Sequence, residues 1–123
     1  MNRSIAAALL ITLCSIAHAS PAADINNGFL TGKSFQSGSQ SMRTAYVIGV
    51  LDGFSYAPVF GAPDTKIEKL RQCIGAMHAD ARQVGTIVDT YLAANPASLS
   101  LQMQPIVLRA MRQVCATHGM TVD

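Results

Sequence analysis

Two cysteines and two histidines in the C-terminal half of the chain have the residue types and spacing of a metal site. Cys73 and His78 form a C-x4-H pair, and Cys115 and His118 form a C-x2-H pair. Thiolate sulfur and imidazole nitrogen are the ligands of tetrahedral structural zinc sites. The same cysteines can instead be oxidised to a disulfide, which the reducing cytosol prevents. The compartment of the protein therefore decides between the two chemistries.

The N-terminus has the organisation of a cleavable secretory signal peptide. Arg3 gives a positive start, an apolar run follows at 5–16, and residues 17–19 are the Ala-His-Ala that signal peptidase favours. The apolar run is shorter than the roughly 20 residues that span a bilayer. We therefore predict a signal peptide at residues 1–19, cleavage after Ala19, a periplasmic location and no membrane segment in the mature chain.

Export favours the disulfide over zinc. Cys14 leaves with the signal peptide, so the mature chain keeps only Cys73 and Cys115, an even pair in a small domain. A bridge between them closes a loop of about forty residues, for which the chain-entropy model gives roughly 4 kcal/mol of stabilisation. We predict a Cys73–Cys115 disulfide, no metal and no cofactor.

The other catalytic motifs that we looked for are incomplete or absent. The segment Gly28–Ser34 is similar to a phosphate-binding loop, but Asn27 stands where that motif requires its first glycine. The sequence has no G-x-S-x-G elbow and no H-E-x-x-H motif. A Cys–His nucleophile would require a free thiol. We expect no catalytic residues and a protein that is not an enzyme.

Charge argues against nucleic acid as a partner. The 123 residues carry nine Lys and Arg against seven Asp and Glu, and loss of Arg3 leaves eight against seven. Nucleic-acid binding needs a concentrated basic face, and the chain has no basic run.

Apolar residues recur at helical spacing through most of the mature chain, and no convincing alternating strand appears. We predict an all-α fold, a small four- to five-helix bundle with one disulfide, formed by residues 41–118. A flexible arm at 20–40, with one turn near Phe35, precedes it. The expected helices cover about 41–57, 65–75 and 79–94, and a last one starts near Pro105.

The ends of these helices have local signals. Thr65 and Glu68 match a capping box, which predicts the start of the second helix at Thr65. Gly75 is expected to end that helix, and Asn95-Pro96 to end the third.

The first helix carries two glycines and one acid. Gly49 and Gly53 lie one turn apart, which favours close approach of another helix, either within the fold or at a dimer seam; a break near Asp52 is the alternative. On an otherwise apolar helix, Asp52 is expected to pair with Arg109 or Arg112, or else to face solvent.

The run 46–53 resembles the Y-V-x-G-x-x-D-[GA] helix of the Rap1a/Tai immunity proteins. Downstream, a Q-x4-V-x2-Y-L-x3-P pattern and a closing V-x2-A-[LM]-x3-C pattern follow in the family's order, and both cysteines match. The stretch 57–71 is longer than in compact members, and His78 stands where a capping hydroxyl is usual. The matching residues are Tyr46, Gly49, Asp52, Cys73, Gln83, Val88, Tyr91, Leu92, Pro96, Val107, Ala110, Met111 and Cys115.

This resemblance implies a periplasmic immunity protein that binds and blocks a type VI secretion peptidoglycan amidase effector, often as a homodimer. Members of the family insert a loop into the toxin's cleft. The candidate loops here are Phe60–Asp64 and Asn95–Gln104, with partner-binding residues Phe60, Asn95, Ser98, Leu99, Ser100, Gln102 and Gln104.

Two alternatives stay open. One is an exported helical structural or interaction module with a different partner. The other is a periplasmic acid-stress chaperone, which would need many groups that change charge on acidification, whereas the mature chain has seven acids and two histidines.

Overall fold

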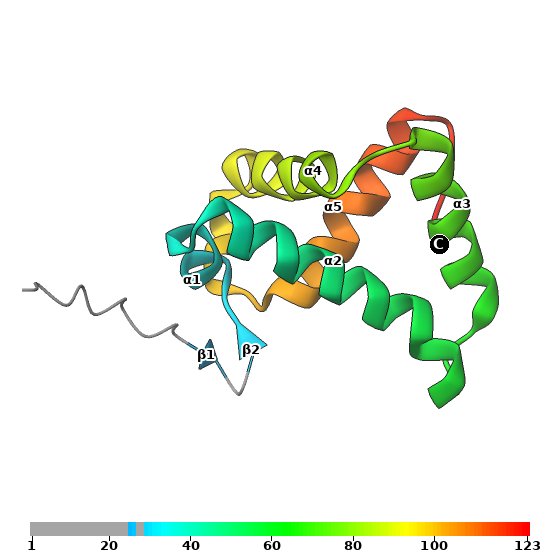
Figure 1. Ribbon diagram of the computed structural model, residues 1–123, viewed down its shortest axis with the longest axis horizontal. Coiled ribbons are helices and arrows are strands. Elements are labelled where there is room, and N and C mark those ends of the chain that lie inside the picture. Colours follow the sequence, from blue (N-terminus) through cyan, green and yellow to red (C-terminus); the bar gives the residue numbers. More distant parts are fainter. Residues whose placement is uncertain (1–24, 27–28) are drawn as a thin grey trace, which may run out of the picture.

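The computed structural model describes residues 25–26 and 29–123, which are almost entirely helical (Figure 1). A short antiparallel pair, β1 (Ile25–Asn26) and β2 (Phe29–Leu30), precedes the helices. The helices are α1 (Gly32–Ser37), α2 (Gln40–Tyr56), α3 (Asp64–Met77), α4 (Ala81–Ala94) and α5 (Met103–Thr117), with 3-10 turns η1 (Ala57–Phe60) and η2 (Pro96–Ser100). The predicted signal peptide and its cleavage site lie outside this part of the chain. No helix within it has the length and apolar character needed to cross a membrane.

The helices pack around one apolar core. In Figure 1, α2 lies below α4, α5 passes behind them, and α3 flanks α5 on the right. Buried apolar side chains come from α1 to α5 and from the C-terminal segment, so a single cluster joins all of these elements. The prediction of an all-α bundle of four to five helices is confirmed, since the described residues form five α-helices. The largest fully buried side chains are Phe35, Leu92, Met103, Ile106, Met111, Val47, Val88 and Val107, with both cysteines of the disulfide.

Part of the segment predicted as a flexible arm at 20–40 belongs to this core. Phe35 of α1 is fully buried, which goes beyond the single turn expected there. The Gly32 N–H donates to the Leu101 carbonyl at 3.0 Å. A β-carbon at Gly32 would lie 2.9 Å from the Leu99 Cα, so the backbones of α1 and η2 are in close contact. The prediction of a flexible arm was therefore wrong for residues 29–40. The free energy gained by burying the Phe35 ring outweighs the preference of the polar neighbouring residues for solvent.

The start of α3 corrects the predicted capping box. An N-cap residue has an extended backbone, and this position belongs to Pro63, which makes no side-chain cap hydrogen bond. Thr65 already lies inside the helix, so the Thr65–Glu68 box is absent. At the other end, α3 continues past Gly75 to Met77 and ends at His78, whose φ is +48°.

A capping box does form at the start of α4. The Asp80 carboxylate accepts from the Gln83 N–H at 2.8 Å, and the Gln83 side chain accepts from the Asp80 N–H at 2.8 Å. This reciprocal pair satisfies two N–H groups at the helix terminus. Asp80 therefore caps α4, two residues after His78, which stands where the family usually has a capping hydroxyl.

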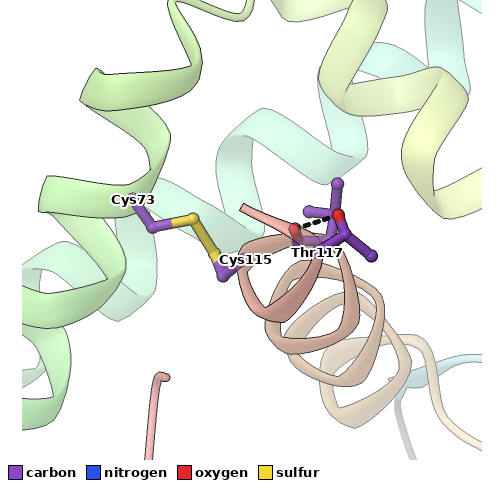
Figure 2. Close-up of a disulfide and its surroundings, with 4 residues drawn as sticks. Cys73, Cys115 and Thr117 are labelled. Atoms are coloured by element: carbon purple, nitrogen blue, oxygen red, sulfur yellow. Dashed lines mark hydrogen bonds between the residues drawn. A yellow bond between two sulfur atoms is a disulfide. The ribbon is translucent and has the colours of Figure 1, made fainter. Parts of the chain in front are cut away.

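The predicted disulfide is confirmed. Cys73 of α3 is bonded to Cys115 near the end of α5, with 5.8 Å between their Cα atoms (Figure 2). Both residues are fully buried. Because the two sulfur atoms are bonded to each other, the alternative zinc site is excluded. His78 and His118 are exposed C-cap residues, and the described residues contain no group of three or more potential metal ligands.

Candidate functional site: an exposed apolar tip

The largest exposed apolar side chains gather where α2 turns into α3. We call residues 56–63 the tip. Tyr56, Val59 and Phe60 are 61%, 64% and 82% exposed, which are the highest values among the large apolar side chains that the structure describes. The rings of Tyr56 and Phe60 pack edge to face with centroids 5.9 Å apart. Figure 1 shows this turn at the lower right, away from α1 and α4.

Backbone constraints fix the shape of the tip. Pro58 lies in the first turn of η1, where its restricted φ suits the helical backbone. Gly61 ends the turn with φ +91°, in the left-handed region that favours glycine. The Gly61 N–H donates to the Pro58 carbonyl at 3.0 Å, and the Ala62 N–H donates to the Ala57 carbonyl at 3.3 Å. The tip is therefore a hydrogen-bonded turn, and its backbone holds the three large apolar side chains outside the core.

The tip contains no charged residue. The helix ends on either side of it are joined by hydrogen bonds. The Arg71 guanidinium donates to the Ser55 carbonyl at 3.0 Å and to the Glu68 carboxylate at 3.0 Å. These contacts join α3 to the last turn of α2. A fixed, uncharged projection with aromatic side chains is suited to filling an apolar cleft on another molecule.

The second predicted loop, Asn95–Gln104, is mostly engaged within the fold. The Asn95 amide donates to the Tyr91 carbonyl at 2.8 Å, which uses the side chain in ending α4. Ser98 is buried, and Gln102 forms a β-bridge with Thr31. Leu99 and Gln104 are half-buried, while Ser100 and Leu101 are exposed. Of the two candidate loops, the one that contains Phe60 offers the larger free apolar surface.

The acidic residue of α2 does not have the expected partner. Asp52 is exposed and forms no ion pair or hydrogen bond within the described part of the chain, so the alternative that it faces solvent is correct. Arg112 donates to Asp123 at 3.3 Å instead, and Arg109 is exposed.

Close helix packing occurs at a different glycine from those predicted. A β-carbon at Gly49 or Gly53 would meet no atom within 4 Å, so neither glycine serves a helix crossing inside the fold. A β-carbon at Gly85 of α4 would lie 2.9 Å from the Thr44 Oγ of α2. Gly85 interrupts the apolar stripe of α4 between Val84 and Val88, which is the sequence signal that could have identified this crossing.

Several residues of the family-like motif have structural roles. Gln83 completes the capping box, Leu92 is buried in the core, and Pro96 begins η2. Tyr46 packs its ring edge to face on Phe35 with centroids 5.9 Å apart. The Tyr46 hydroxyl is buried and has no hydrogen-bond partner among the residues that the structure describes, and burial raises the pKa of this phenol.

Comparison of the chain with protein-family models, with curated proteins and with solved structures found no match. Membership of the Rap1a/Tai family therefore stays a prediction from the motif residues.

Proposed function

We propose that this chain is an exported, non-catalytic inhibitor that binds a peptidoglycan amidase effector, with the tip entering the effector's cleft. The observation that carries the proposal is the exposure of Tyr56, Val59 and Phe60 on a constrained turn. The chemistry of the tip supports an apolar cleft as its receptor. The motif resemblance supports an amidase of the type VI secretion system as the protein that has this cleft.

Two physical features favour tight binding. The turn is held by the Gly61–Pro58 and Ala62–Ala57 hydrogen bonds, so little conformational freedom is lost on association. Aromatic side chains buried at the centre of an interface dominate binding energy, with losses of about 2 kcal/mol or more when they are truncated. Phe60, the most exposed of the three, is the expected anchor.

The test uses the exported protein and a peptidoglycan amidase effector, chosen first among the products of neighbouring genes. Phe60→Ala is expected to weaken binding about thirtyfold, which corresponds to roughly 2 kcal/mol. Leu101→Ala is the matched control, because Leu101 is an exposed apolar residue of the second candidate loop. Binding is measured by calorimetry, and inhibition by release of peptide from peptidoglycan.

Each outcome decides the proposal. Loss of binding and inhibition in Phe60→Ala but not in Leu101→Ala supports it, whereas the opposite pattern assigns the contact to the loop at 95–104. Lack of binding by the wild-type protein would overturn the amidase as partner. Insertion of the tip into phospholipid vesicles without amidase binding would assign the tip to a membrane surface. The homodimer that the resemblance implies would appear as twice the monomer mass in light scattering.

A further inference from the structure

A pocket of about 190 Å³ lies between α3 and α5, next to the tip. Its walls include the buried or half-buried side chains of Phe54, Leu70, Leu108 and Val122. The C-terminal segment that carries Val122 folds back beside α3 (Figure 1). The interior of this pocket is therefore apolar, and water bound there would find few hydrogen-bond partners.

The charged residues that line the pocket are Lys66, Arg112 and Asp123. Lys66 is exposed, and its ammonium group has no ion pair or hydrogen bond in the described part of the chain. Arg112 holds Asp123 by one contact of 3.3 Å between exposed groups, which is a weak pair. Two cations and one acid thus border an apolar pocket, so these side chains leave one positive charge in excess, and the position of Asp123 shows that a carboxylate can approach Arg112.

The volume sets the size of the ligand. An apolar cavity of about 150 Å³ engineered in another protein binds benzene, so a pocket of 190 Å³ admits one six-membered ring. We propose that this pocket binds a small aromatic carboxylate. The ring lies against Phe54 and Leu108, and the carboxylate is held by Lys66 and Arg112 through charge-assisted hydrogen bonds.

The test is a titration of the isotope-labelled exported protein with benzoate, toluene and benzylamine, followed by amide chemical shifts. Benzoate is expected to give saturable shifts at residues around the pocket, with a dissociation constant in the millimolar range for a ligand of this size. Benzylamine is expected to bind more weakly than benzoate, because its charge opposes those of Lys66 and Arg112 and only Asp123 among the lining residues carries the opposite charge. Lys66→Met should weaken benzoate about fivefold to tenfold.

Lys69→Met is the matched control, because Lys69 is an exposed lysine of the same helix that does not line the pocket. Equal affinity for the three ligands, no shifts with benzoate, or the same loss in both lysine variants would overturn the proposal. Shifts of equal size at Lys33, Lys66 and Lys69 would show non-specific anion binding and would also overturn it. Neither variant removes an apolar contact of the core, and thermal melts would verify that both remain folded. The titration does not involve the amidase, so its result is independent of the function proposed above.

Discussion

Arg43 of α2 places its guanidinium against both carboxylate oxygens of Asp89 on α4. The Nε atom lies 3.1 Å from Oδ1, and a terminal nitrogen lies 3.2 Å from Oδ2. The other terminal nitrogen donates to the Gly38 carbonyl at 2.6 Å, just before α2 begins. One side chain thus joins α2, α4 and the connection from α1, and its partial burial limits screening by water.

Replacing Arg43 is therefore expected to loosen the packing of α2 on α4. Arg43→Met should lower the free energy of unfolding by about 1–2 kcal/mol, because a bidentate and partly buried pair is lost together with a backbone contact. Lys69→Met, which removes an exposed cation with no ion pair in the described part of the chain, should change it by less than about 0.5 kcal/mol. Urea unfolding followed by circular dichroism measures both. Equal effects of the two substitutions would show that the Arg43 contacts contribute nothing specific.

The glycines of α2 and α4 should respond in opposite directions to alanine. Gly49→Ala is expected to raise the free energy of unfolding by up to about 1 kcal/mol, because the new methyl group meets open space and alanine favours the helix. Gly85→Ala should instead lower it by about 1–2 kcal/mol, because the β-carbon would lie 2.9 Å from the Thr44 hydroxyl. Thermal unfolding of both variants checks the prediction, and a stabilised Gly85→Ala would contradict it.

Removal of the Tyr46 hydroxyl is not expected to destabilise the folded protein. Tyr46→Phe keeps the ring against Phe35 and removes a buried polar group that has no partner, so stability at pH 7 should stay the same or rise by up to about 1 kcal/mol. A loss of more than 1 kcal/mol would mean that the hydroxyl is hydrogen-bonded in solution.

Because of Tyr46, we also expect the free energy of unfolding to depend on pH in the alkaline range. Burial raises the pKa of Tyr46 in the folded state, so above the unfolded value of about 10 the folded protein keeps a proton that the unfolded chain releases. The stability that this group contributes is complete below pH 10 and decreases as the pH rises further. Urea unfolding at pH 8 and pH 10.5 should show a steeper decrease for the wild type than for Tyr46→Phe.

Alanine substitutions at Asp80 and Thr65 compare the observed capping box of α4 with the one predicted for α3. Asp80→Ala should cost about 1 kcal/mol, because the N–H of Gln83 loses its acceptor. Thr65→Ala should cost little, because the Thr65 side chain caps nothing at the start of α3. Urea unfolding of the two variants gives the comparison, and a larger loss in Thr65→Ala would restore the cap predicted at that position.

Removal of the disulfide should have the largest effect on stability. The double substitution of Cys73 and Cys115 by serine is expected to lower the free energy of unfolding by about 3–4 kcal/mol, since the bridge closes a loop across 42 positions of sequence. Treatment of the wild type with dithiothreitol should give a similar loss. Unchanged stability after verified reduction would contradict the assigned role of the bridge.

The all-α fold could be predicted because the spacing of apolar residues within each segment indicates a helix without any knowledge of the other segments. The position of Phe35 was missed because its burial depends on α2 and α5, which no local pattern around Gly32–Ser37 contains. The capping box at Thr65 was wrong because α3 has its N-cap at Pro63, two residues earlier than predicted, and the Thr65–Glu68 spacing does not fix where the helix begins. At the candidate site, Phe60 was named because it lies in one of the two loops that the family resemblance made candidates, whereas the internal roles of Asn95 and Ser98 require the folded contacts.

The positive φ of Gly61 has a consequence for protein engineering. Any side chain at this position would strain the turn, whereas Val59 and Phe60 point outward and can be varied without changing the backbone. A combinatorial library that randomises positions 59 and 60, and keeps Pro58 and Gly61 constant, would display new side chains on an unaltered scaffold. The turn could then be used to select binders for other clefts.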